Sequence, residues 1–473
     1  MRSCLTIAVI AVTALAGCVN YAPRPLDARA ELTALASRSL PDVVTERGGD
    51  PMPGIPIAAF DLSDGVNEGE AVAVALTLNP DLQVARASIG ESEALLVSAR
   101  VLPNPELGVG FQQGFNGTPG FVLDADLLFE LLKPGERSAR VGAAAARAEA
   151  SRAAVLAQEY HLATDVRRQV LTVLVAERQL ALLDDEASLR KRAEELVRQR
   201  KEVGEGNELE VSAATLDAAE VERDRRLARA ELERARLELR QLMGLPPTVS
   251  VPLTDSGKPL AVMMFNEPSN SELQDRMLAG RLDLRVKEAE YHAAEEDLRL
   301  AVARQYPRLK IGPSFEHDGV SDNYVGVGAT LELPIFDRNQ GGIASAAAAR
   351  DRLHAQYTAL LHRLSSTAFA ARSRARLARE EVDAEEQDIL PRLQHNQDLS
   401  RAAFEARELN VFDWISAQQR ALRTRRAYLD SVAAYRLAVL ELDAATGFAI
   451  SKQPSTTSRT QTGTTPIVTT PKE

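Results

Sequence analysis

Two carboxylates lie three residues after an asparagine, each at the start of a predicted helix. Glu210 follows Asn207, and Asp413 follows Asn410. This spacing resembles a capping box, in which side chains at both positions bind the first turn of the helix. A carboxylate can also attract cations and repel anions by its charge. The pattern therefore leaves a helix-capping role and an electrostatic role open for both residues.

Six further charged residues alternate with apolar ones in two predicted hairpins, at residues 105–131 and 307–333. Each hairpin reads as two short strands around a turn, so one face is apolar and the other is wet. Leu123 and Val327 belong to the apolar faces. The charged positions assigned to the wet faces are Asp124, Asp126, Glu130, Arg308, Lys310 and Glu332.

A cysteine ends an apolar leader. Residues 1–17 combine Arg2 with an apolar stretch, which is typical of a signal peptide and too short to span a membrane as a helix. Leu15-Ala16-Gly17-Cys18 resembles a bacterial lipobox, which predicts a lipid on Cys18. Val19 follows the cysteine, and by that resemblance it favours sorting to the outer membrane. An ordinary leader that happens to end in cysteine is the alternative.

Catalysis, metal binding and nucleic-acid binding find no support in the composition. The histidines are scattered without metal-ligand spacing, and no P-loop, nucleophile elbow or zinc motif occurs. Met263-Met264 could be soft-metal ligands, but packing in a Pro-rich segment is the more ordinary role. The net charge of −11 argues against nucleic acid. The sequence predicts no enzyme activity, no cofactor and no resident metal.

The chain contains one unit twice. Residues at an offset of 202 match without gaps over a long window, and at later positions the offset becomes 203. Pairs at offset 202 include Asp81 with Asp283, Pro105 with Pro307 and Glu130 with Glu332, and pairs at offset 203 include Asn207 with Asn410 and Gly244 with Gly447. A repeat this long is not a solenoid repeat. The sequence therefore predicts a pseudo-symmetric single domain.

The two units divide the chain into six segments. The expected segments are a lipoprotein signal peptide (1–17), an extended N-terminal segment (18–67), the first repeat (68–244), a Pro-rich inter-repeat segment at the equator (245–270), the second repeat (271–447) and a disordered tail (448–473).

Helices dominate both repeats, so the fold class is mainly α with a β portion. Residues 137–203 contain no proline, which predicts one helix of about 100 Å. Residues 208–243 predict the antiparallel return helix. The second repeat is read in the same way, with helices at about 342–405 and 411–446. Each unit thus supplies one long helical hairpin.

Four strands cannot close a barrel, because eight is the practical minimum. Strands of about ten residues match a tilted crossing of an outer membrane. The free edges must then pair with further copies, so the sequence predicts an oligomer with a shared barrel. In that barrel Leu123 and Val327 face lipid, while the charged positions face the lumen.

The chain resembles TolC-type outer membrane factors over nearly its whole length. These are the ducts of tripartite efflux pumps and type I secretion systems. The motifs LPNPEL (102–107) and LPIFDRNQGG (333–342) are most similar to the heavy-metal-efflux branch typified by CzcC. The resemblance implies a homotrimer, with a twelve-stranded β-barrel in the outer membrane and an α-barrel in the periplasm. It also implies a periplasmic membrane-fusion (adaptor) protein and an inner-membrane pump of the RND type as partners, with outer membrane lipid around the barrel.

The same resemblance points to a periplasmic aperture at the helical tips. Asp413 falls where the family often has an acid that narrows this aperture, and Glu210 is its counterpart in the first repeat. Arg407, in the turn before, would pair with an acid of a neighbouring helix, or it is a solvated turn residue. The family often has a second acid three residues on, where this chain has Ser416. That departure weighs against a double acidic ring.

Export is the function that the resemblance implies. The expected role is passage of substrate from periplasm or pump to the exterior, with heavy-metal cations as one candidate cargo. A type I secretion or drug efflux system is the alternative. A structural periplasmic coiled-coil lipoprotein is a remote alternative, since it would not need two amphipathic hairpins. The expected location is the outer membrane of a Gram-negative bacterium, anchored at Cys18 and extending into the periplasm.

Overall fold

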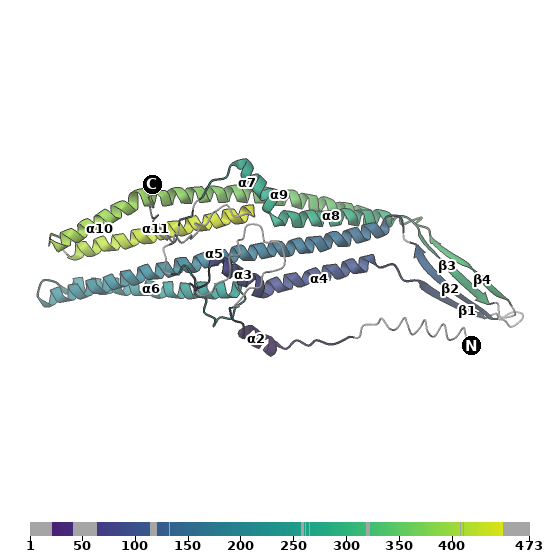
Figure 1. Ribbon diagram of the computed structural model, residues 1–473, viewed down its shortest axis with the longest axis horizontal. Coiled ribbons are helices and arrows are strands. Elements are labelled where there is room, and N and C mark those ends of the chain that lie inside the picture. The colour runs from purple at the N-terminus through teal and green to yellow at the C-terminus, as the bar shows by residue number, and fades with distance from the viewer. Residues whose placement is uncertain are drawn as a thin grey trace, which may run out of the picture.

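The computed structural model describes residues 21–40, 64–113, 121–131, 133–256, 260, 262–263, 265–317, 322–406, 408–409 and 411–447. The first repeat contains α3 (Glu68–Leu78), α4 (Pro80–Arg100), β1 (Glu106–Gln113), β2 (Phe121–Leu131), α5 (Glu136–Glu202) and α6 (Glu208–Leu242). The second contains α7 (Asn270–Gly280), α8 (Leu282–Ala303), β3 (Arg308–His317), β4 (Asn323–Glu332), α9 (Gln340–Ala384), the π-helical turn η2 (Glu385–Ile389), α10 (Leu390–Glu405) and α11 (Val411–Thr446). A further helix, α2 (Ala28–Ala36), precedes both repeats. The molecule is elongated, with the sheet at one end and the helical tips at the other (Figure 1).

In the first repeat, α4 and α6 lie one after the other along the long helix α5 (Figure 1). They meet at Asn79, whose side chain accepts from the Leu82 N–H at 3.0 Å and donates to the Leu242 carbonyl at 2.9 Å. Pro80 occupies the first turn of α4, where its missing N–H costs nothing. Asparagine followed by proline is a typical helix start in sequence, and here Asn79 also joins α4 to α6.

Two glycines hold equivalent places in the two repeats. Gly244 follows α6 with φ 69°, and Gly447 follows α11 with φ 74°. Both lie in the left-handed region, where glycine avoids the steric cost of a Cβ. A Cβ on Gly244 would collide with the Leu78 carbonyl, and one on Gly447 with the Gly280 carbonyl. The return helix of each repeat therefore ends against the junction of its two shorter helices.

The four strands form one antiparallel sheet in the order β1-β2-β3-β4. The two predicted hairpins are present, and β2 pairs with β3 from Leu123 opposite His317 to Leu131 opposite Leu309. This central pairing joins the repeats. Within the described residues, β1 and β4 each have a strand on one side only. An edge of this kind presents backbone groups that can pair with another chain.

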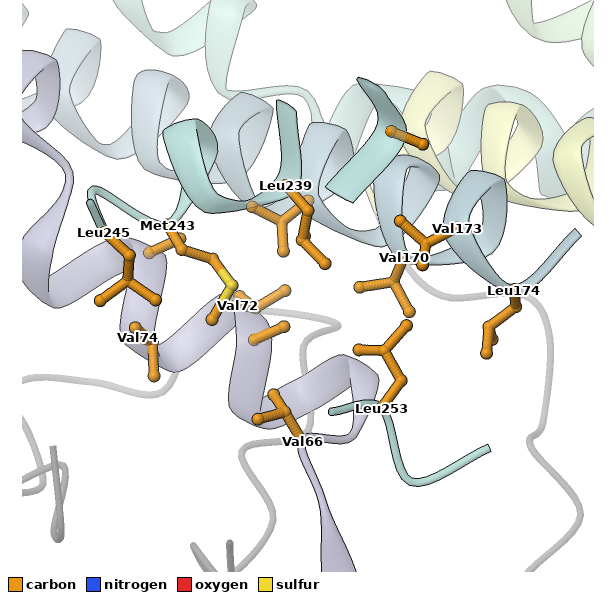
Figure 2. Close-up of a cluster of buried hydrophobic side chains, with 14 of the residues drawn as sticks. Val66, Val72, Val74, Val170, Val173, Leu174, Leu239, Met243, Leu245 and Leu253 are labelled. Carbon is orange, nitrogen blue, oxygen red and sulfur yellow. The ribbon is translucent and has the colours of Figure 1, made fainter. Parts of the chain in front are cut away.

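Two apolar clusters lie where the helices of each repeat converge. In the first, Val72 of α3, Val170 of α5 and Leu239 of α6 are at most 4% exposed (Figure 2). In the second, Met263 packs with Tyr435, and the Met263 carbonyl accepts from the Tyr435 hydroxyl at 2.7 Å. Burying a side chain of this size contributes roughly 1.5–3 kcal/mol. Met263 is therefore a packing residue, as the sequence favoured, while Met264 lies outside the described residues.

Two expectations from the sequence are wrong in detail. The segment 18–67 is not extended throughout, because α2 forms after Asp27, whose carboxylate accepts from the Arg29 and Ala30 N–H groups. This helix buries none of its residues, so a search for apolar periodicity does not find it. The helix expected at 342–405 is not continuous either, since η2 separates α9 from α10.

Candidate functional site

The strand register places all six charged strand candidates on one face of the sheet. Asp126 is opposite Gly108 on one side and Ser314 on the other, and Lys310 is opposite Glu130 and Thr330. Residues paired across strands point to the same face. The same parity includes Asp124, Arg308 and Glu332.

Glycines make room for two of these carboxylates. Gly110 is opposite Asp124 and Gly108 is opposite Asp126. A Cβ on either glycine would overlap the carboxylate across from it. The two aspartates thus lie back over β1. A depression of about 400 Å³ opens beside them, lined among others by Asp124, Asp126, Ser314, Glu316 and Tyr324.

Lysine and arginine compensate only part of the charge on this face. The Lys310 ammonium lies 2.7 Å from both carboxylate oxygens of Glu106, reaching from β3 over β2 to β1. Arg308 lies 3.6 Å from Glu332. Glu106 and Glu316 were not among the predicted site residues, although strand parity alone could have found them. Among the described residues, this face carries more acids than bases, namely Glu106, Asp124, Asp126, Glu130, Glu316 and Glu332 against Arg308 and Lys310.

The opposite face of the sheet is apolar and exposed in the single chain. Val325 and Val327 of β4 are 83% and 73% exposed, and Leu107 of β1 is 69% exposed. Phe111 and Phe121 stack there with ring centroids 6.0 Å apart. An apolar surface of this extent is typical of contact with lipid or with another protein.

At the first helical tip Asn207 caps α6, and the Glu210 carboxylate binds the side chain of that cap. Asn207 accepts from the Glu210 N–H at 2.9 Å and donates from its amide to Glu210 Oε1 at 3.1 Å. The carboxylate binds the side chain of the cap rather than its backbone N–H, so the box is not the standard one. Glu210 is half-buried.

At the second tip, Asp413 is exposed in the first turn of α11. Its neighbour Trp414 stacks on Phe404 of α10 with ring centroids 5.0 Å apart. Asn410 and Arg407 lie outside the described residues, and so does Cys18. Glu210 and Asp413 sit on different hairpins, whose tips lie at the same end of the molecule (Figure 1).

Charged side chains also connect the two repeats between the helical tips and the equator, which is the level of α3 and α7 near the middle of the long axis (Figure 1). Arg190 of α5, 9% exposed, pairs with Asp217 of α6 and lies 3.7 Å from Glu186. Glu186 in turn lies 3.9 Å from Arg426 of α11. Sequence reasoning missed these residues. The only signal was a charge inside an otherwise apolar helix stripe, and a solvated face gives the same signal.

A second polar network lies at the equator. Arg167 of α5 pairs with Glu68 of α3 and lies 3.9 Å from Asp443 of α11. The Tyr160 hydroxyl donates to the Asp443 carbonyl at 2.9 Å, and burial raises the pKa of Tyr160 to about 12. These contacts tie α3, α5 and α11 together across the repeats.

Asp283, at the start of α8, belongs to the same region. Its Oδ1 lies 3.2 Å from Nε2 of His161, and Arg281 pairs with its other oxygen. The hydrogen bond with His161, helped by the charge of Arg281, lowers the pKa of Asp283 to about 2. The carboxylate is therefore ionised at every ordinary pH.

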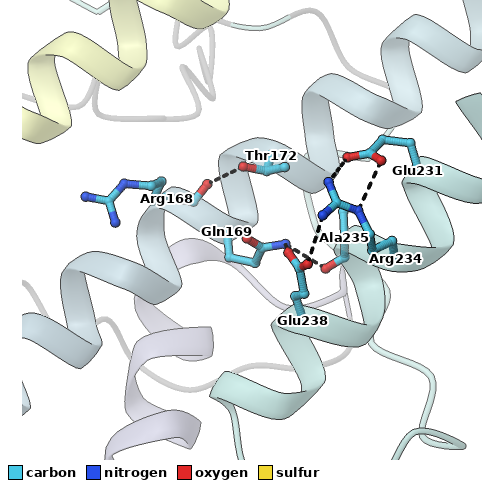
Figure 3. A network of polar contacts seen from close by, with 7 residues as sticks. All are labelled: Arg168, Gln169, Thr172, Glu231, Arg234, Ala235 and Glu238. Atoms are coloured by element: carbon cyan, nitrogen blue, oxygen red, sulfur yellow. Dashed lines mark hydrogen bonds and ion pairs between the residues drawn. The ribbon is translucent and has the colours of Figure 1, made fainter.

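Between α5 and α6 the contacts are polar as well as apolar. The Gln169 amide donates to the Ala235 carbonyl at 2.8 Å and to Glu238 at 3.2 Å (Figure 3). Arg234 bridges Glu231 and Glu238 on the exposed side of α6. Exposed pairs of this kind contribute little each, so they keep the helix face soluble rather than hold the hairpin together.

Neither a resident metal site nor a spanning helix emerges from the described part of the chain. No group of three or more metal-ligating side chains comes together among those residues. No helix there has the length and apolar character needed to cross a membrane.

Long helical hairpins that end in a two-faced sheet with open edges define a class, the protomers of outer membrane channels. The sequence model for outer membrane efflux proteins matches residues 71–245 and 273–448, and the chain belongs to that family. The resemblance predicted from the sequence is confirmed.

Three relatives illustrate the similarity. The cobalt-zinc-cadmium resistance protein CzcC of Cupriavidus metallidurans is 25% identical over 360 residues, which is 76% of this chain and 84% of CzcC. The pyoverdine export outer membrane protein OpmQ of Pseudomonas aeruginosa is 26% identical over 386 residues, 76% of this chain and 79% of OpmQ. The crystal structure of the Campylobacter jejuni CmeC outer membrane channel matches with a TM-score of 0.68 at 16% identity, over 92% of this chain and 95% of that one. At 16% identity, this match shows that the two chains share a fold and shows nothing further.

Proposed function

We propose that this chain is the outer membrane duct of a tripartite efflux system, and that its cargo is a heavy-metal cation. The observation that best supports a duct function is the sheet, which has one charged face, one apolar face and two open edges. Similarity to CzcC supports a metal cargo. The excess of carboxylates on the charged face suits passage of cations.

Three copies would complete the channel. Four strands from each would give a twelve-stranded barrel, with Val327 and Leu123 toward lipid and the charged face toward the lumen. The helical hairpins would then form the periplasmic part, with the tips of α5–α6 and α10–α11 toward an adaptor and an RND-type pump. Lipid on Cys18 would add an anchor. A duct of this kind is a wet passage, so it needs no metal-ligating cluster of its own.

Planar bilayers test the duct and its charge together. The purified chain should conduct, and the reversal potential in a salt gradient should show a preference for cations. Asp124→Asn with Asp126→Asn should reduce that preference because it removes two lumenal charges per copy. Val325→Thr, on the opposite face, keeps the charge and serves as the control. A chain that forms no conducting assembly would overturn the duct, and an unchanged preference would overturn the lumenal assignment.

The cargo needs a separate measurement. Similarity to OpmQ favours a second candidate, export of an organic metal chelator of the siderophore type. Cells that carry the chain with its adaptor and pump should tolerate more cobalt, zinc or cadmium, and should accumulate less of it, than cells that lack only the chain. Unchanged metal tolerance with loss of a secreted chelator would favour the second candidate.

A further inference from the structure

The long helix of the second repeat changes its hydrogen bonding at η2. There the Leu390 N–H donates to the Glu385 carbonyl, five residues back instead of four. Its counterpart α5 is helical without interruption from Glu136 to Glu202. A π-helical turn holds one residue more than the α-helix it replaces, and such turns are frequent at functional sites.

Proline reinforces the break. Pro391 lies in the first turn of α10, directly after η2. It has no N–H to donate, and its ring crowds the carbonyl four residues earlier. Sharp changes of helix direction occur at prolines and at π-bulges, and this segment has both. In Figure 1, α10 leaves α9 in a new direction, while α5 runs on past the same level.

Packing beyond η2 is also looser than in the first repeat. α10 buries none of its residues. The corresponding part of α5 buries Arg190, Ala193 and Val197. Within η2, Glu385 is 7% exposed and its Oε2 has no hydrogen-bond partner. A buried carboxylate oxygen without a partner is costly, and segments with few buried contacts open most readily.

We propose that η2 and Pro391 form a hinge, about which α10 and its tip change direction relative to α9. The 16 residues of α10 make a lever of about 24 Å, so a small change at the hinge moves the tip by several ångströms. The proposal concerns motion within one chain, and it stands or falls independently of any transported substrate.

Contacts with α11 show which parts would move together. The Tyr428 hydroxyl donates to Glu386 Oε1 at 2.8 Å and holds the hinge itself against α11. Beyond the hinge, Arg425 donates to Gln397 at 3.1 Å, and Trp414 stacks on Phe404. These contacts link the tip portion of α11 to α10, while Arg426 of α11 also lies 3.9 Å from Glu186 of α5. Since α11 is unbroken, it accommodates the motion by smooth curvature.

Distances between spin labels on either side of η2 test the hinge. Leu377→Cys with Asn396→Cys places two exposed labels across it, and Thr172→Cys with Lys191→Cys places two exposed labels on unbroken α5. Both pairs are 19 residues apart, about 28 Å along a straight helix. The full-length protein is diluted with unlabelled chain, so that distances within one chain dominate. The parent chain, whose cysteines are Cys4 and Cys18, gives the background.

The pair across η2 should show a distance distribution about twofold broader than the pair on α5, as expected for a hinge rather than a fixed bend. Deleting Gln387 together with Pro391→Ala removes the added residue and the proline, and should narrow the distribution to that of α5. Equal widths for the two native pairs would overturn the hinge, even if the deletion variant failed to fold. A distribution that stays broad in a folded deletion variant would also overturn it.

Discussion

At the scale of single residues, Asp283 shows how one carboxylate supports the equator. It faces His161 of α5 and Arg281 at the turn between α7 and α8. The Arg281 guanidinium also donates to the Ala444 carbonyl next to Asp443 of α11. Asp283 thereby links the second-repeat junction to the long helix of the first repeat. Its low pKa means that this link is charged in the folded state.

Asp283→Asn should destabilise the folded protein at neutral pH by about 2 kcal/mol, because the folded state lowers the pKa of Asp283 from 3.8 to about 2. A lowered acid pKa stabilises the fold above the unfolded value, and this contribution is lost as pH falls from about 4 toward 2. In detergent, the native protein should therefore unfold at a higher temperature than the Asp283→Asn variant at pH 7, and this difference should disappear in acid. A difference in unfolding temperature that does not change with pH would contradict a stabilising role for the ionised Asp283 carboxylate.

Sequence reasoning reached the charged sheet face but not the charges that join helices. Strand parity fixes a face as soon as the strands are known, so Asp126 and Lys310 could be assigned together. The contacts of Arg167 with Asp443 and of Glu186 with Arg426 depend on which helices become neighbours between the two repeats. Their charged side chains occur equally on solvated faces of helices, and no local pattern separates the two cases.

At the scale of elements, features with a local sequence signal could again be predicted, and features without one could not. The start of α4 was predictable because Asn79 and Pro80 are local signals with local causes. The break at η2 was not predicted, since neighbouring residues remain helical and a proline near the start of a helical turn is tolerated. α2 was missed because it buries nothing. Helix caps could be predicted from the sequence, whereas the change from α-helical to π-helical hydrogen bonding within one helix could not.

The two faces of the sheet give the prediction at this scale. Leu123→Arg should reduce the amount of assembled protein, because an outward arginine near the middle of the bilayer costs about 2–4 kcal/mol. Asp126→Arg, three positions further along β2 on the charged face, should be tolerated. Detergent extraction followed by sizing measures the assembled fraction of each variant. Equal losses would overturn the assignment of one face to lipid and the other to the lumen, and a larger loss for Asp126→Arg would reverse it.

At the scale of the whole molecule, the proposed trimer brings three second-repeat tips toward one axis. Within one chain Asp413 is exposed, whereas Glu210 is half-buried. Carboxylates gathered around an axis attract cations and resist anions. Of the two acids predicted at the tips, Asp413 is therefore the better candidate for a ring that narrows the aperture.

Asp413→Ala should weaken the block of single channels by multivalent cations and raise their conductance, with little change in thermal stability. Glu210→Ala is the matched control. Its carboxylate binds the side chain of the capping residue Asn207, so the substitution should lower stability by less than about 2 kcal/mol and leave the cation block intact. If Asp413 only caps α11, its substitution will instead lower stability by about 0.5–2 kcal/mol and leave conductance alone. Purified assemblies in planar bilayers, with unfolding followed in the same detergent, distinguish the two outcomes.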